Sequence, residues 1–215
     1  MSHLEFNDLK KAELGYRHES RWELNKCCRG IYGGVSWPGK RPGFAVVVGM
    51  DPHKHFDSYD ICLIAEYESP SIRKVVRQCG VMDYTYEPDR WIGDWKNDSA
   101  DNFIRELNSE QAHKSQKLSF SLTPMLEMEP LYPYMLDELK RLLDPKRRML
   151  FLKGSKIINY LGEIEADDIS TLVLGDYPAI EAICFAVFSM LDTNKYKRKR
   201  PLPKMQDMTF KIGAA

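Results

Sequence analysis

The 215-residue chain lacks an excess of charge of either sign and lacks any hydrophobic run long enough to cross a membrane. Lysine and arginine together number 31, as do aspartate and glutamate, so the formal net charge at pH 7 is +0. This balance predicts no overall attraction to nucleic acid or to a membrane, although a local basic patch is compatible with it. The longest apolar run, 179–191, contains Glu181 and is shorter than the roughly 20 residues of a membrane-spanning helix. We therefore expect a soluble protein with no membrane partner.

A cysteine-pair motif and a glycine-rich phosphate-binding motif are also missing from the sequence. The five cysteines (Cys27, Cys28, Cys62, Cys79 and Cys184) form no Cys-x-x-Cys pair, and their number is odd. This favours a reducing compartment over a disulfide framework. The phosphate-binding loop G-x-x-x-x-G-K-[ST] does not occur, so these residues are not predicted to form a P-loop ATPase.

Apolar runs and turn residues predict an α/β order of elements. Residues 1–43 are polar and glycine-rich, and we expect an N-terminal arm or linker there. Strands are predicted at 44–50, 60–68, about 72–83, 90–93, 118–122 and 149–152. Helices are predicted from Asp98, over 131–143, and from about 176 to 191. The order predicts a domain over 44–192, with a mixed sheet of three antiparallel strands followed by parallel strands and flanked by helices. A basic tail, 193–215, follows.

Acidic residues stand where predicted strands end or helices begin. Asp51 ends the first predicted strand, Asp94 follows the strand at 90–93, and Asp176 opens the last helix. If the two strands are neighbours and the helix packs across them, the three carboxylates could hold two divalent cations about 4 Å apart and catalyse phosphodiester hydrolysis. Oxygen ligands suit Mg²⁺ or Mn²⁺. Each acid taken alone is better explained as a turn or cap residue.

Three short motifs carry a resemblance to a known family. They are Gly-Met-Asp-Pro at 49–52 followed by Asp-Ile-Cys-Leu-Ile at 60–64, Arg-Trp-Ile-Gly-Asp at 90–94, and the start of the last helix at 174–183. Together they resemble the nuclease domain of tailed-phage large terminases. The resemblance implies a ribonuclease-H-like fold and a metal-dependent endonuclease. In that family the enzyme cuts double-stranded DNA during viral genome packaging, in the cytoplasm of the bacterial host.

The resemblance also implies a ligand set for two Mg²⁺ or Mn²⁺ ions. Asp51, Asp94 and Asp176 would be the catalytic acids, with Asp57 or Asp60 as an auxiliary metal ligand. Glu181 is the second choice for the third acid, because it matches the family's helix acid by register from the alanine that follows it. The family's ATPase motor is not found in these residues, so the implied partners are a separate packaging ATPase and a portal or small terminase subunit.

Basic residues in two places form the candidate DNA-binding set. A compact basic run in the tail and two lysines near residue 155 could neutralise phosphates. A solvated, disordered terminus explains the tail about equally well. The set comprises Lys195, Lys197, Arg198, Lys199, Arg200, Lys153 and Lys156.

Two other functions stay open. His53, His55 and Asp57 give His-x-His-x-Asp, which is most of a metallo-β-lactamase-type zinc signature. Ser58 stands where the signature should end in histidine, so a zinc hydrolase is the weaker alternative. The acid pair usual at the last helix is incomplete, and this favours a catalytically weak nucleic-acid-binding or assembly module of the same fold.

Overall fold

The computed structural model describes residues 13–14, 28, 30–52, 59–93, 98–113, 132–143, 149–152, 154–164 and 174–192; for a few of these, including Asp51 and Asp60, it describes only the backbone. The strands are β1 (Glu13–Leu14), β2 (Gly30–Ser36), β3 (Gly43–Pro52), β4 (Tyr59–Ser69), β5 (Arg90–Gly93) and β6 (Met149–Leu152). The helices are α3 (Ile72–Tyr86), α4 (Asp98–His113), α5 (Tyr132–Leu143), α6 (Lys156–Gly162), α7 (Pro178–Asp192) and a short 3₁₀ helix, η3 (Leu174–Asp176).

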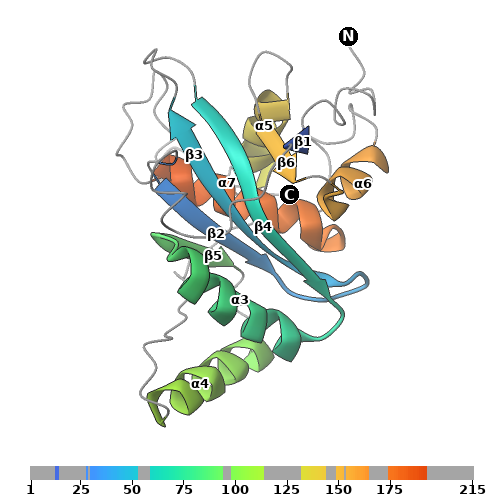
Figure 1. Cartoon of the computed structure of the whole chain (residues 1–215). Helices are drawn as coiled ribbons and strands as arrows, with labels where there is room; N and C mark the ends of the chain where they lie inside the picture. The colour runs from blue at the N-terminus through green and yellow to red at the C-terminus, as the bar shows by residue number, and fades with distance from the viewer. Residues whose placement is uncertain are drawn as a thin grey trace, which may run out of the picture.

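The strands form one mixed sheet in the order β1-β6-β4-β3-β2-β5. Consecutive strands β2, β3 and β4 are antiparallel, whereas β5 runs parallel to β2 and β6 runs parallel to β4. Helices α3 and α4 cover one face of the sheet, and α5, α6 and α7 cover the other (Figure 1). The predicted fold class is therefore confirmed: a mixed sheet of three antiparallel strands, then parallel strands, flanked by helices.

The central strand β3 contributes to a hydrophobic core on each face of the sheet. Phe44, Val46 and Val48 belong to the core beneath α5, α6 and α7, whereas Ala45 and Val47 belong to the core beneath α3 and α4. Successive side chains of a strand point to opposite faces, so a strand covered on both sides is apolar at every position. This explains the continuous apolar run that predicted the strand at 44–50.

The third antiparallel strand is not the segment that we predicted. Residues 72–83 form most of helix α3, and the strand prediction there is wrong. Valine and isoleucine favour strands, but the buried residues of α3 include Val75, Val76 and Cys79, which recur at the three- and four-residue steps of a helix face. Periodicity therefore outweighed β-propensity in this segment.

The missing antiparallel strand is β2, which lies within the predicted N-terminal arm of 1–43. Its sequence, Gly-Ile-Tyr-Gly-Gly-Val-Ser, contains three glycines, which usually indicate a loop. Two of them are required by close packing. A Cβ atom on Gly33 would lie 2.2 Å from Cδ2 of Trp91, and one on Gly34 would lie 2.0 Å from the carbonyl oxygen of Ala182 in α7. The boundary placed at residue 43 is therefore too late, because β2 is part of the sheet.

Most of the remaining predictions are confirmed with small shifts at the ends of the elements. The strands predicted at 60–68, 90–93 and 149–152 are β4, β5 and β6, and the three predicted helices are α4, α5 and α7. Helix α6 was not predicted; it begins after Ser155, whose side chain accepts a hydrogen bond from the Ile157 N–H. The strand predicted at 118–122 lies outside the described residues. Within the described ranges, no helix has the length and apolar character to cross a bilayer.

Candidate active site

The topology brings the carboxyl ends of β2 and β5 to the same edge of the sheet. These strands are parallel neighbours, and Val35 near the end of β2 pairs with Gly93, the last residue of β5. Helix α7 packs against β2 because Gly34 has no side chain to hold it away. The first turn of α7 carries Glu181. Ligand sites of open α/β sheets commonly lie beyond the carboxyl ends of strands, so this edge is the candidate active site.

Glu181 is the buried carboxylate at this edge. The Ser36 hydroxyl at the end of β2 donates a hydrogen bond of 2.5 Å to its Oε2, and the Tyr132 hydroxyl at the start of α5 donates one of 2.8 Å to its Oε1. Glu181 is only 6% exposed and Ser36 only 1%. Burying a carboxylate is costly unless both oxygens find partners. The two hydroxyls meet this requirement and fix the direction in which the carboxylate points.

The loop between β2 and β3 is attached to helix ends near the same site. Arg41 forms an ion pair of 2.8 Å with Glu163, and its guanidinium lies 4.6 Å from the ring centroid of Tyr177 and 5.5 Å from that of Tyr160. The hydrogen bond from Arg41 to Glu163 raises the pKa of the guanidinium above its usual value. These contacts hold the loop against α6 and the start of α7.

A second set of carboxylates fastens α6 to β4. Glu66 accepts hydrogen bonds from the Ser155 hydroxyl and the Lys156 backbone N–H, at 2.6 and 2.7 Å. Glu68 forms an ion pair with Lys156 and accepts a hydrogen bond of 2.7 Å from the Tyr160 hydroxyl. Burial, followed by the interaction with Glu68, raises the pKa of Tyr160 to about 12. Lys156, a predicted DNA-binding residue, is therefore engaged within the fold.

The structure does not bring Asp51 to the candidate active site. Met50 pairs with Gly30 at the start of β2, whereas Gly93 pairs with Val35 near its end. Because β2 spans seven residues, the ends of β3 and β5 are separated by about 20 Å along the sheet. The predicted adjacency of these two strands is wrong: β2 lies between them, and β3 runs in the opposite direction to β5.

The other predicted acids lie in different parts of the structure. Asp60 pairs with Asp51 across β3 and β4, so it shares the far edge of the sheet. Asp176 ends η3, before the helix rather than at its cap, and forms an exposed ion pair of 3.0 Å with Lys40. Of the predicted acids that the structure describes, Glu181 is thus the one at the ends of β2 and β5. Outside the described residues lie Asp57, Asp94, His53, His55, Lys153, Lys195, Lys197, Arg198, Lys199 and Arg200.

Ser36 and Tyr132 are the site residues that sequence reasoning missed. Ser36 was missed because β2 was assigned to the arm. The signal available for it was the presence of the strand-favouring residues Ile31, Tyr32 and Val35, followed by Trp37-Pro38-Gly39, a typical turn before the next strand. Tyr132 was correctly placed at a helix start, but nothing in the sequence indicates that its hydroxyl reaches Glu181.

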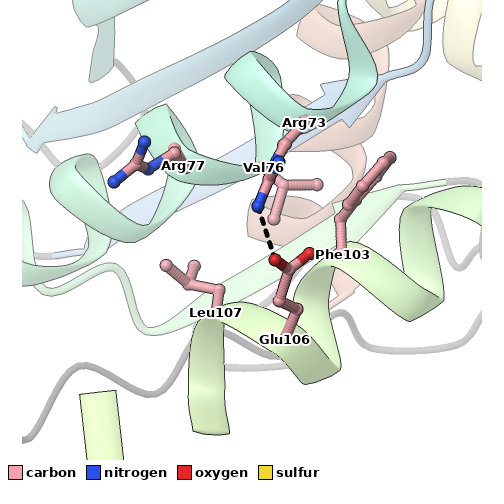
Figure 2. Close-up of a pocket in the computed structure, with 6 residues that line it drawn as sticks. All are labelled: Arg73, Val76, Arg77, Phe103, Glu106 and Leu107. Atoms are coloured by element: carbon pink, nitrogen blue, oxygen red, sulfur yellow. Dashed lines mark hydrogen bonds and ion pairs between the residues drawn. The ribbon is translucent and has the colours of Figure 1, made fainter. Parts of the chain in front are cut away.

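A separate hollow lies between α3 and α4, on the opposite face of the sheet from Glu181. Figure 2 shows its lining and the ion pair between Arg73 and Glu106 that crosses it. Arg73 also lies 5.8 Å from the Phe103 ring centroid. The hollow contains none of the predicted catalytic acids. Its lining residues are Arg73, Val76, Arg77, Phe103, Glu106 and Leu107.

Comparison with solved structures defines the class of fold. The chain is similar to the nuclease domain of g2p, the large terminase of bacteriophage SPP1, crystallised with bound Mn, with a TM-score of 0.50 and 15% identity over 83% of this chain and 94% of that one. It is also similar to the large terminase nuclease of the thermophilic phage G20c with bound zinc, with a TM-score of 0.50 and 12% identity over 85% and 96%. No protein-family model matches the sequence, and no curated protein does.

The fold is therefore the ribonuclease-H-like fold of large terminase nuclease domains, as the sequence motifs implied. The Glu181 edge offers one hard oxygen donor for a divalent cation, a buried carboxylate that accepts hydrogen bonds from the Ser36 and Tyr132 hydroxyls. Within the described residues, no group of three His, Cys, Asp or Glu side chains is placed to hold a metal ion. The Asp94 side chain is not among them.

Proposed function

We propose that this chain is a divalent-metal-dependent nuclease domain that hydrolyses the backbone of double-stranded DNA at the Glu181 edge of its sheet. One observation carries the proposal. In a fold shared with terminase nucleases crystallised with Mn and zinc, a buried carboxylate stands where the carboxyl ends of two parallel strands meet.

Each residue of the site has a proposed role. Glu181 would bind Mg²⁺ or Mn²⁺, and Asp94, which follows Gly93 directly in the sequence, would be the second acid. A divalent ion held there would supply an activated water and would stabilise the leaving oxygen. Ser36 and Tyr132 orient Glu181. Asp51 and Asp60 are not part of this centre, because they pair with each other at the opposite edge of the sheet.

The proposed substrate and partners follow from the same comparison. Phosphate contacts from the basic tail and from Lys153 would position DNA without reading its sequence. By analogy with a terminase, a separate packaging ATPase and a portal or small terminase subunit would deliver the DNA.

Plasmid nicking with paired variants tests the proposal. Purified chain is incubated with supercoiled plasmid in Mg²⁺, Mn²⁺ or Zn²⁺, and the rate of nicking is measured. Glu181→Gln and Asp94→Asn are expected to reduce Mn²⁺-dependent cleavage by about a hundredfold or more. Loss of a group that only supports a metal ligand already costs up to about a hundredfold, and loss of a ligand should cost at least as much. Asp51→Asn is the matched control and is expected to keep wild-type activity. Full activity in Glu181→Gln, or loss in Asp51→Asn alone, would contradict the assignment.

A second candidate function is supported by Ser36. A neutral hydroxyl, rather than an acid, faces Glu181 at the end of β2, which favours a catalytically weak DNA-binding or assembly module of the same fold. The two candidates differ in one result: the weak module retains DNA in a gel-shift assay but cleaves it with none of the three metals. No described contact favours a zinc hydrolase at His53 and His55.

A further inference from the structure

Ser36 occupies a position from which a side chain reaches the buried carboxylate directly. It is the last residue of β2 and is 1% exposed. Its face of the strand is fixed, because Gly34, two residues earlier, contacts α7 while Val35 belongs to the opposite core. Its Oγ lies 2.5 Å from Oε2 of Glu181. A longer acidic side chain at position 36 would therefore enter the same small space as the Glu181 carboxylate.

The chemistry of that space depends on whether residue 36 is neutral or acidic. Two carboxylates that bind one Mg²⁺ or Mn²⁺ ion each place an oxygen about 2.1 Å from it, so their oxygens lie about 3 Å apart. The contact between Ser36 and Glu181 is already near this spacing. A serine hydroxyl adds no negative charge, and its proton occupies one lone pair of Oε2.

We infer that Ser36 keeps the divalent-metal affinity of the Glu181 site low by standing where a further carboxylate, beside those of Glu181 and Asp94, would share the ion. This inference deepens the proposed function and rests on it. It assigns Ser36 the role of an affinity-determining residue that is not itself a ligand. The same β2 backbone and the same α7 packing would then serve either a weak or a tight metal site, according to this one side chain.

The substitution Ser36→Asp has opposite expected effects with and without metal. In EDTA the new carboxylate lies against Glu181, and repulsion between two buried like charges lowers the melting temperature. In Mn²⁺ the pair shares the ion, and binding to the folded state restores stability by mass action. Ser36→Asn is the matched control, because asparagine has the shape of aspartate without its charge.

The experiment measures Mn²⁺ binding by calorimetry and thermal unfolding in EDTA and in Mn²⁺, using the full chain. We expect Ser36→Asp to bind Mn²⁺ at least about tenfold more tightly than wild type, because ligand charge strongly sets affinity. Ser36→Asn should show no gain in affinity.

The outcomes separate this inference from the proposed function. If Glu181→Gln binds Mn²⁺ as wild type does, the proposed metal centre is wrong. If Glu181→Gln loses binding but Ser36→Asp binds no more tightly than Ser36→Asn, only the inference is overturned. It is also overturned if Ser36→Asp stays unfolded in Mn²⁺ while Ser36→Asn folds.

Discussion

The two ends of β2 differ in chemistry and in surroundings. At its carboxyl end, Ser36 contacts Glu181, and the neighbouring strand β5 ends alongside at Gly93. At its amino end, Gly30 pairs with Met50, and the β3 backbone continues to Asp51, which pairs with Asp60. The first end carries a serine and receives its acid from a helix. The second carries two acids on adjoining antiparallel strands.

Strand direction explains why the more acidic end is not the candidate active site. Parallel strands bring their carboxyl ends to one edge, so β2 and β5 meet, and α7 can pack across both. An antiparallel neighbour delivers its carboxyl end to the opposite edge. Asp51 is thus an acid at the end of a strand, but the strand runs the wrong way. Whether an acid can belong to the candidate active site therefore depends on the edge of the sheet at which it lies. Its position after an apolar run in the sequence does not decide this.

The largest expected effect concerns the packing that creates the Glu181 end. Gly34→Ala places a methyl group 2.0 Å from a backbone oxygen of α7, which cannot move as a side-chain tip could. We expect a loss of about 3 kcal/mol in the free energy of unfolding, measured by urea denaturation. Gly39→Ala is the control: a Cβ atom added at Gly39 would have no atom within 4 Å, so the stability should change by less than about 0.5 kcal/mol. Equal effects at both glycines would show that α7 does not rest on Gly34.

The next prediction concerns the hydroxyl on the other oxygen of Glu181. Tyr132→Phe removes the donor to Oε1, and we expect a loss of about 1–3 kcal/mol, the usual cost when a buried charged acceptor loses its partner. Tyr134→Phe, on the same helix at 41% exposure, should cost less than about 0.5 kcal/mol. Thermal unfolding of the two variants decides the matter. If both variants are equally stable, Tyr132 does not support the buried carboxylate.

The sequence predicts the class of fold better than the site, and two segments explain the difference. The 44–50 run is apolar at every position, so its strand is evident. The β2 segment combines glycines that local preference assigns to a loop, although tertiary packing against Trp91 and Ala182 requires them. Reading α3 as the third strand compensated for the missing β2, and the total of three antiparallel strands remained correct.

Because β2 was missed, the predicted site was placed at the end of β3 instead of at the end of β2. With β2 missed, β3 became the first strand of the predicted sheet and Asp51 became its terminal acid. Glu181 was retained only as the second choice, because its burial and its contact with Ser36 depend on residues 145 positions apart in the chain. No local pattern encodes a contact of that separation. The pairing of β2 with β5, which only the structure shows, identifies Glu181 as the acid at the candidate active site.

The smallest expected effect is that of changing Asp176, the acid before α7, in contrast to Glu181 in the first turn of the helix. Asp176 and Lys40 form an exposed ion pair, with side-chain exposures of 45% and 82%, and such pairs contribute about 0–1 kcal/mol. Asp176→Asn should therefore leave the free energy of unfolding within about 0.5 kcal/mol of wild type, and Mn²⁺ affinity unchanged in calorimetry. Glu181→Gln, only five positions along the chain, should abolish that binding. If Asp176→Asn instead weakened Mn²⁺ binding as strongly, the third acid would be the exposed residue before the helix. The buried contact between Ser36 and Glu181 would then be structural only.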